Sequence, residues 1–441
     1  MTSSRGAEWR YSAMNLGMTI SAQLSAFFTL FYVDRLKVSP QLWAGLLAVL
    51  AIYNAIDNPL IGHLSDRTRS RWGRRVVFLR FATAPTFVAL ALLFWAPVNA
   101  VSNEVLTLVW FVVWWLVWET CGTAMGTGYL GLLPEMFTSF EERSRVAVRM
   151  NAFQVVGLLI GLAAPPALAQ AIGWGPAVTI FVAIALVAVY QGIPAMRENV
   201  PSTPAPSLWS SLRHTFGNRS FVTVVLAQTM RFVCTGALTM GMGLYVKYSL
   251  GGNDAITSIL LAMAFIVAGF ALWPWRRFVA DRWGARTTLL AAYAVVGIGA
   301  GLLYVAPAGV WVYLVTALVG VGLSGMILMG DVIVADVIDE DEARTGERRA
   351  GAYYGLSGLI TTLSGTVTAI AFGVVATVYG YDPKLAAQPD SVATGFRVFM
   401  SAVPALASAV AIGLLVLYPL HGQRLARMRA DLAERRAAIP R

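Results

Sequence analysis

The chain has little charge for its length. Only 13% of its 441 residues are Asp, Glu, Lys or Arg, whereas 57% are hydrophobic, and the mean hydropathy is +0.66. A soluble domain averages about 25% charged residues, so this composition could not cover a surface that faces water on all sides. The sequence therefore excludes an ordinary soluble fold.

Cysteine, histidine and lysine are scarce as well. Cys121 and Cys234 both fall within apolar runs, and the three histidines have no ligand-like spacing. This excludes a disulfide framework and argues against a metal site. No phosphate loop or nucleophile–base spacing is present, so neither an enzyme nor a cofactor is predicted. Lysine occurs only as Lys37, Lys247 and Lys384, so arginine supplies most of the positive charge.

Long apolar runs fill most of the sequence. About twelve of them approach the ~20 residues needed to cross the core of a bilayer. They are long and lack the alternation of barrel strands, so helices must satisfy the backbone. The predicted fold is an all-α membrane protein with twelve transmembrane helices, at about residues 11–33, 41–63, 76–97, 104–131, 150–171, 175–195, 220–247, 256–278, 287–306, 310–334, 351–379 and 397–420.

Positive charge is concentrated in alternate loops. The net charge of +10 would also suit a nucleic-acid-binding protein. However, arginines gather after the second, fourth, sixth, eighth and tenth runs, whereas loops such as "NAVSNE" and "GGNDAI" have almost none. Because cytoplasmic loops carry the excess of Lys and Arg, this pattern predicts cytoplasmic termini and no nucleic-acid partner. No removable signal peptide is predicted in the first residues.

The chain repeats one plan on either side of a central linker. An Asp-Arg pair followed by glycine and arginine occurs in "HLSDRTRSRWGRR" and again in "FVADRWGARTT". Weak internal repetition of this kind is typical of transporters built from two six-helix halves. The predicted parts are an N-terminal six-helix bundle, a cytoplasmic linker, a C-terminal six-helix bundle and a basic tail exposed to solvent or lipid headgroups, at residues 1–196, 197–219, 220–420 and 421–441.

Two motifs carry a family resemblance. The segments "NAIDNPLIGHLSDRTRSRWGRR" and "VIVADVIDEDEARTGERRAGAYYG" resemble the glycoside–pentoside–hexuronide:cation symporters of the major facilitator superfamily, the family of melibiose permease. The resemblance covers essentially the whole chain. It implies a secondary transporter that moves a sugar or sugar derivative with H⁺ or Na⁺ by alternating access. Together with the dominance of arginine over lysine it suggests a bacterial inner membrane, and the protein is expected to be a monomer. A zwitterion or lysolipid-like amphiphile as substrate, and a non-transporting sensor or scaffold, remain alternatives.

A carboxylate inside the second run is the leading cation-coupling candidate. The resemblance implies two acidic residues at positions that hold Asn54 and Asn58 here, whereas Asp57 lies between them, and Thr123 matches the family's threonine. A carboxylate at bilayer depth costs about 2.5–3.5 kcal/mol, so it usually faces a cavity and has a function. A proton would neutralise the single charge without further ligands. The neighbouring amides and hydroxyl would also suit Na⁺, so both ions remain open.

The expected sugar site departs from the family pattern. The resemblance places sugar-binding aspartates at positions that hold Met18 and Gly126 here, a tryptophan at Leu130 and a lysine at Thr362. Only Arg149 matches an arginine of the family's pocket. A melibiose-like galactoside site is therefore not predicted.

Four charged residues are predicted to line a substrate cavity. Glu119 lies one helical turn before Thr123 on the same face of the fourth run. Arginines would give bidentate donors to an anionic group, and acids would accept from an amine or hydroxyl. Alternatively, Glu119 makes a helix contact and the remaining charges pair with each other inside the bundle. The predicted substrate-binding residues are Glu119, Arg149, Arg231 and Asp331.

Acids and bases near the cytoplasmic ends of the runs are predicted to form gating salt bridges. The alternative is that the arginines only anchor the topology. The predicted gating residues are Asp66, Arg67, Arg74, Arg75, Asp281, Arg282, Arg286, Asp336, Asp339, Arg348 and Arg349.

Overall fold

The computed structural model describes residues 5–68, 70–73, 75–137, 140–196, 217–345, 350–385 and 387–437, so most of the expected linker lies outside it. The described residues form helices and turns, with no strand among them. The α-helices are α1 (Arg5–Leu24), α2 (Pro40–Arg67), α3 (Val76–Leu93), α4 (Ala100–Met136), α5 (Phe140–Leu158), α6 (Ala164–Ile172), α7 (Trp174–Tyr190), α9 (Arg219–Leu244), α10 (Asp254–Pro274), α11 (Asp281–Val305), α12 (Val310–Thr345), α13 (Ala350–Val378), α14 (Asp390–Val416) and α15 (Gly422–Ala437). Short 3₁₀ and π turns continue several of them: η1 (Ser25–Phe27), η2 (Leu30–Arg35), η3 (Leu159–Ala163), η4 (Ile193–Ala195), η5 (Tyr245–Ser249) and η6 (Trp275–Ala280).

Ten helical segments of the described chain are long and apolar enough to cross a membrane. The longest runs through 52 residues, Asp254–Val305, and contains two of the expected spans. At ~1.5 Å per residue it would extend about 80 Å, more than twice the thickness of a bilayer core. Gly284 breaks it with φ 77°, a conformation that favours glycine. The apolar part of α2 is a shorter helix, Pro40–Asn54. The molecule is therefore a multi-pass membrane protein.

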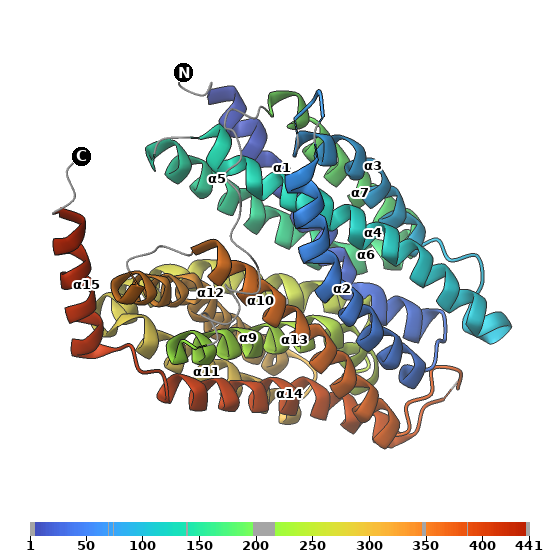
Figure 1. Ribbon diagram of the computed structural model, residues 1–441. Helices are drawn as coiled ribbons and strands as arrows, with labels where there is room; N and C mark the ends of the chain where they lie inside the picture. The colour runs from blue at the N-terminus through green and yellow to red at the C-terminus, as the bar shows by residue number, and fades with distance from the viewer. Residues whose placement is uncertain are drawn as a thin grey trace. The chain divides into compact units, whose positions relative to one another are not determined.

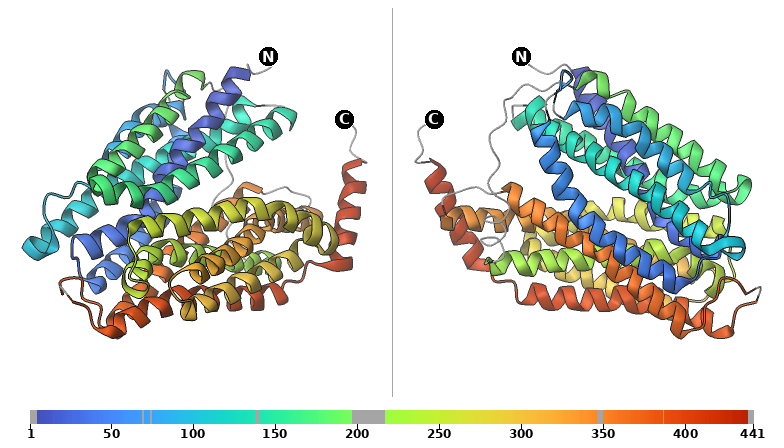
Figure 2. Two further views of the ribbon diagram at one scale, coloured as in Figure 1. Left: turned by 180° about the vertical axis from the view of Figure 1, so that it is seen from behind. Right: turned by 45° about the vertical axis from the view of Figure 1, so that its right-hand side comes forward.

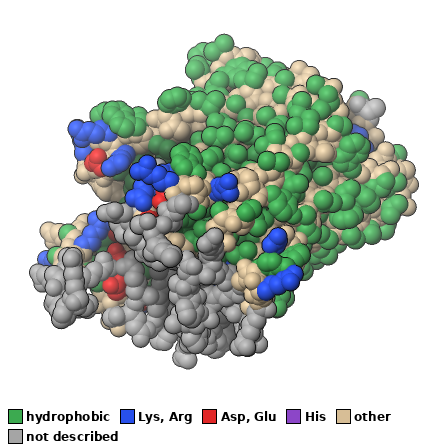
Figure 3. Space-filling view, turned by 90° about the horizontal axis from the view of Figure 1, so that it is seen from above, with side chains coloured by type: hydrophobic (Ala, Val, Ile, Leu, Met, Phe, Trp, Pro, Cys, Tyr) green, Lys and Arg blue, Asp and Glu red, His purple; other side chains and the backbone are tan. Residues whose placement is uncertain are grey.

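The exposed side chains fit a lipid environment. Figure 3 shows hydrophobic side chains over most of the visible face, with Lys and Arg gathered in a few places. Phe270 is 80% exposed and Val378 is 72% exposed. Soluble monomers rarely expose apolar patches larger than a few hundred Å², so this surface is covered by acyl chains rather than by water.

The contacts divide the chain into two compact units. Unit 1 comprises Met1–Thr203, Thr239–Phe265 and Phe372–Phe396. Unit 2 comprises Pro204–Leu238, Ile266–Ala371 and Arg397–Arg441. Unit 1 thus contains the end of α9, the start of α10 and the loop that joins α13 to α14, in addition to the first seven α-helices.

Unit 1 is built around α1. This helix packs against α5 and α7, while α3 packs against α4 and α7, and α2 against α4 (Figures 1 and 2). Close approach needs small residues. A Cβ on Gly157 of α5 would lie 2.9 Å from the backbone oxygen of Leu16 on α1. Tyr11 of α1 also stacks on Tyr129 of α4, with the ring centres 4.5 Å apart. Such packing replaces the hydrophobic driving force that helices lack inside a bilayer.

Unit 2 is built on the pairing of α11 with α12, and α15 packs against α12. Two ion pairs hold α15: Arg429 to Asp336 at 2.5 Å, and Arg424 to Glu340 at 2.9 Å. Met428 of α15 is buried between them. Most of the other described side chains of α15 are exposed, so these contacts attach one side of the helix to α12. Exposure of the tail to solvent or headgroups stays a prediction.

Candidate functional site

A cavity of ≈ 300 Å³ opens inside unit 1 between α1, α3 and α4. Its lining includes the polar residues Ser21, Ser25, Thr86, Trp118 and Glu119. The volume is at the lower end of the ~300–1,000 Å³ typical of small-molecule sites. Met18 and Gly126, at which the family resemblance implied aspartates, line it too.

Glu119 is the charged group of this cavity lining. It reaches the cavity together with Thr123, one turn further along α4. Among the described residues it has no hydrogen bond and no ion pair. Neighbouring Trp118 is held differently, because its Nε1 donates to Ser21 Oγ at 3.1 Å. The carboxylate is therefore free to accept hydrogen bonds from a ligand.

Asp57 of α2 lies beside Thr123, which lines the cavity. Its side chain is buried, with 3% of the residue exposed, and the hydroxyls of Tyr53 and Thr123 face its carboxylate. Its Oδ2 atom has no hydrogen-bond partner within the described residues. Asp57 and Glu119 are close enough for their charges to repel. A buried, unpaired oxygen is costly, so this pair of carboxylates is prepared for a positive charge.

Of the two amides predicted beside Asp57, the structure describes the side chain of one. Asn54 is half-buried on α2 and makes polar contacts. The side chain of Asn58 lies outside the described part of the chain. The structure therefore brings together Asp57, Thr123 and Glu119 of the predicted site, and it leaves the amides as predictions.

Arg149 is held by a different partner from the one predicted. Its Nη1 atom lies 2.6 Å from Glu8 Oε2, and Arg145 Nη2 lies 3.3 Å from Glu8 Oε1. Its guanidinium also stacks 4.7 Å from the ring centre of Trp9. Glu8 is 1% exposed, so the pair of arginines satisfies a buried carboxylate near the start of α1. Arg149 is not part of the cavity lining that contains Glu119.

The two charges of the second half lie in unit 2. Arg231 of α9 places its guanidinium 4.3 Å from the ring centre of Phe232 and is half-buried. Asp331 is a helical residue of α12, but its side chain lies outside the described part of the chain. Their binding roles remain predictions.

The predicted gating residues have varied surroundings. Arg75 covers Gly131 of α4, where a Cβ would meet its guanidinium. Arg286 donates to the carbonyls of Leu415 and Val416, at 2.8 and 3.0 Å, and so caps the end of α14. Asp281 and Arg282 are exposed at the start of α11, and Asp339 is half-buried in α12, in which Asp336 pairs with α15. The side chains of Asp66, Arg67, Arg74, Arg348 and Arg349 lie outside the described part of the chain.

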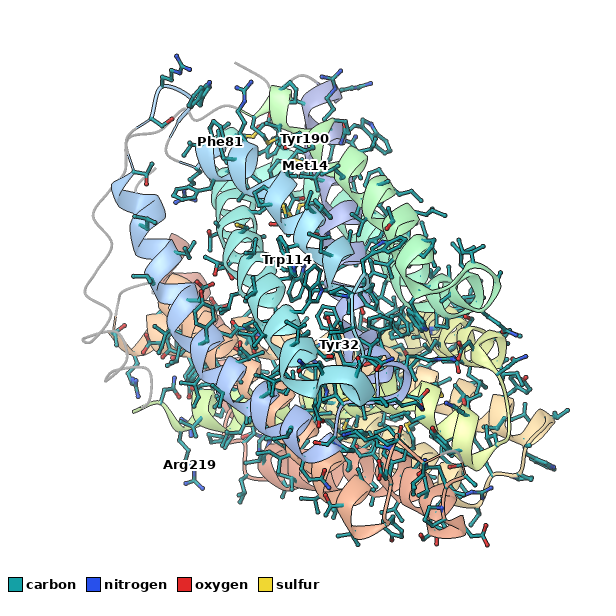
Figure 4. The ribbon with its side chains drawn as sticks, turned by 90° about the vertical axis from the view of Figure 1, so that its right-hand side faces the viewer. Met14, Tyr32, Phe81, Trp114, Tyr190 and Arg219 are labelled. Carbon is teal, nitrogen blue, oxygen red and sulfur yellow. The ribbon has the colours of Figure 1, made fainter. Side chains whose placement is uncertain are left out.

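The sequence reasoning missed a charged cluster at the other end of α1. Asp34 of η2 is fully buried and lies 2.7 Å from Lys247 Nζ of η5. Tyr248 and Tyr381 also donate to its carboxylate. Burial raises the pKa of Tyr381, and the charge of Asp34 adds to the effect, so this hydroxyl stays protonated and donates. The scarcity of lysine was the available signal. Figure 4 labels Tyr32, two residues before Asp34, toward the opposite end of unit 1 from Met14 and Tyr190.

Comparison with known proteins places the chain in a family. A family described as "MFS/sugar transport protein" matches residues 11–422. An uncharacterised symporter of Synechocystis is 30% identical over 34% of this chain and 29% of its own length. An isoprimeverose transporter of Lactiplantibacillus pentosus is 22% identical over 67% of this chain and 63% of its own length. A glucuronide carrier protein homologue of Escherichia coli is 24% identical over 97% of this chain and 96% of its own length.

The fold agrees with these matches. A bacterial homologue of the human lysosomal transporter Spinster, solved in an inward-facing and unoccupied conformation, has a TM-score of 0.68 and 12% identity over 98% of this chain and 99% of its own. Fold and family together define a multi-pass membrane transporter, a class of protein distinct from enzymes. The chain belongs to the MFS/sugar transport protein family, and the resemblance to glycoside–pentoside–hexuronide:cation symporters is confirmed.

Proposed function

We propose that the chain couples the uptake of a sugar or sugar derivative to the entry of H⁺ or Na⁺ by alternating access. The observation that carries this proposal is the pair Asp57 and Glu119, two carboxylates without a cationic partner among the described residues, beside a cavity whose lining includes serine and threonine. Carboxylates at bilayer depth are expensive and are kept for function. The sugar-transport family and its symporter relatives support the same assignment.

The positions of the two carboxylates suggest different roles, one in binding the ion and one in binding the substrate. Asp57 is buried, has one oxygen with no hydrogen-bond partner in the described part of the chain, and is the binding group for the coupling ion. Glu119 reaches the cavity and accepts hydrogen bonds from substrate hydroxyls. Because the two charges repel, a cation on one of them lowers the cost of keeping the other ionised. Ion and substrate thus favour each other's binding, as symport requires.

The lining of the cavity favours a polyol. Ser25 and Thr86 donate their protons to backbone carbonyls of Ala22 and Ala82, so their oxygens remain as acceptors for sugar hydroxyls. Trp118 adds an aromatic face of the kind that sugars pack against. A lysolipid-like amphiphile would instead need a long apolar channel, so it is the less favoured substrate.

The proposed architecture has twelve transmembrane helices in two six-helix repeats. The 52-residue segment Asp254–Val305 supports two crossings, and α2 supports one more. The arginine-rich alternate loops support cytoplasmic termini, and the bacterial relatives support an inner membrane. The protein is proposed to act as a monomer and without a cofactor other than the coupling ion.

Uptake into proteoliposomes tests the function. Purified protein is reconstituted, a pH or Na⁺ gradient is imposed in turn, and a panel of radiolabelled glycosides, pentosides and hexuronides is offered. We expect accumulation of at least one of them under only one of the two gradients. Equal equilibration with and without either gradient would refute coupling, and no uptake of any member of the panel would refute the sugar assignment.

Glu119→Gln tests the substrate ligand. The amide keeps the shape of the side chain but loses the charge, and a hydrogen bond to a charged group contributes about 1.5–3 kcal/mol. We therefore expect the KM for the transported sugar to rise at least about tenfold, because 1.4 kcal/mol corresponds to a factor of ten. Glu119→Asp is the matched control, since it keeps the charge, and it should recover part of the affinity. An unchanged KM in Glu119→Gln would remove the residue from the site.

A further inference from the structure

Asp34 is a buried carboxylate of unit 1 with several hydrogen-bond donors around it. Lys247 Nζ lies 2.8 Å from its Oδ1 and 2.7 Å from its Oδ2, and the hydroxyl of Tyr381 lies 3.2 Å from Oδ1. The hydroxyl of Tyr248 donates to the same oxygen. All of these donors come from the second half of the sequence, whereas Asp34 comes from the first. One buried carboxylate thus joins the ends of α1 and α9 and the loop after α13.

Asp34 and Lys247 lie at the ends of helices that occupy equivalent places in the two halves of the sequence. The chain reads Tyr-Val-Asp where α1 finishes and Tyr-Val-Lys where α9 finishes, and both ends are π turns. The N–H of Leu36 bonds to the carbonyl of Phe31, and the N–H of Leu250 bonds to the carbonyl of Tyr245, each at the same five-residue spacing. The two helix ends therefore have the same local backbone structure but carry side chains of opposite charge.

Every lysine of the chain lies in this region. Lys384 pairs with Glu104 at 3.1 Å, and Lys37 lies close enough to Asp34 and Lys247 for their charges to act on it. Burial lowers the pKa of Lys37, and the charge of Lys247 acts in the same direction. Lys37 also has φ 70°, a strained conformation for a residue with a Cβ. Lysine binds water more strongly than arginine does, so it separates from a carboxylate more readily when water enters.

The charges of the region balance. Arg35 pairs with Asp254 at 2.7 Å, beside the pairs formed by Asp34 and Glu104. The cations are Arg35, Lys37, Lys247 and Lys384, and the carboxylates are Asp34, Glu104, Asp254 and Asp382, four of each sign, so the net charge is zero. Because the charges balance, repulsion between like charges destabilises the paired arrangement only slightly. Arg35, Lys247 and Lys384 are already partly exposed, so separating the set mainly requires water to hydrate the buried Asp34.

We propose that Asp34 and Lys247 form a latch that closes the end of the molecule at which α1 and α9 finish, and that the latch separates whenever the cavity opens at that end. With cytoplasmic termini, this is the periplasmic end. The inference rests on the proposed alternating access. The closed latch is favoured because the buried carboxylate of Asp34 accepts hydrogen bonds from Lys247, Tyr248 and Tyr381. Losing these donors without gaining water would leave a buried charge unpaired. The latch therefore biases the empty transporter toward the state that is shut at this end.

Thiol labelling tests the latch without any substrate. Cys121 and Cys234 are replaced by alanine, and Ser25→Cys, in the cavity lining, serves as the reporter. A membrane-impermeant maleimide is added to right-side-out and to inside-out vesicles. In Asp34→Asn and Lys247→Met we expect labelling from the periplasmic side to be about tenfold faster, because a charged hydrogen-bonded pair shifts a two-state equilibrium by that order. Labelling from the cytoplasmic side should slow.

Further variants separate the latch from a general loss of charge. Lys384→Met removes a half-exposed partner of Glu104 in the same region and should label like the parent. The reversal Asp34→Lys/Lys247→Asp should return labelling toward the parent rate. Faster labelling from both sides would show that a single variant is unfolded. In that case the double variant Asp34→Asn/Lys247→Met, which leaves neither charge unpaired, is used to test the latch. Parental rates in that variant, or equal effects in Lys384→Met, would overturn the latch. Because no solute or gradient is used, a failure of symport would leave this result standing.

Discussion

The variant Asp57→Asn is expected to abolish accumulation driven by an ion gradient. The substitution keeps the size of the side chain but removes the negative charge that the coupling ion neutralises. Solute should still cross by exchange, because Glu119 and the hydroxyls of the cavity are untouched. The ratio of internal to external solute concentration in proteoliposomes should fall to about 1, because a carrier that is not coupled to an ion gradient only equilibrates its solute.

A carboxylate on the surface provides the control for this result. Asp390→Asn makes the same chemical change at an exposed position in the first turn of α14, and it should accumulate solute like the parent. Counterflow measured in the same vesicles separates a coupling defect from a dead protein. Full accumulation in Asp57→Asn would assign the ion to another group and refute the proposed role of this residue.

The variant Gly17→Ala should strongly destabilise unit 1. Gly17 faces α7, where a Cβ would collide with the backbone oxygen of Ala185 and lie 2.8 Å from Cγ2 of Val189. A backbone atom cannot rotate away as a side chain can, so α1 and α7 must move apart. Overpacking of this kind costs about 1–3 kcal/mol. The apparent melting temperature in detergent should therefore fall by several degrees, although alanine is the better helix former by about 0.5–1 kcal/mol.

Gly301→Ala is the matched control for the packing argument. Gly301 is exposed on α11, and a Cβ there would meet nothing within 4 Å. The control should leave the melting temperature unchanged or raise it slightly, since only helix propensity changes. A similar loss in both variants, or no loss in Gly17→Ala, would show that α1 and α7 do not pack as closely as described.

Much of the candidate site could be anticipated from single residues. Asp57 and Glu119 stand out because carboxylates are rare in apolar runs, and helical periodicity places Glu119 and Thr123 on one face. The structure brings these three residues to one region. The role of each remains a prediction that the variants above test.

Pairings between distant helices could not be anticipated. Arg149 was predicted to bind the substrate because it matches an arginine of the family's pocket. Nothing in the sequence links it to Glu8, 141 positions earlier, with which the structure pairs it. Asp336 was predicted as a gating residue, and it pairs with Arg429 of the tail. Asp34 and Lys247 each look like an ordinary charge at the end of an apolar run, and their partnership spans 213 positions. Local patterns contain no information about which run lies beside which.

The sequence alone determined that this protein lives in a membrane as a set of apolar helices, because composition and run length follow directly from the solvent that surrounds each segment. It also determined the family, through two motifs and the length of the match. Only the tertiary structure decided which charges are neutralised. Electrostatic partners are set by distances of a few ångströms between helices, and those distances exist only once the helices have packed.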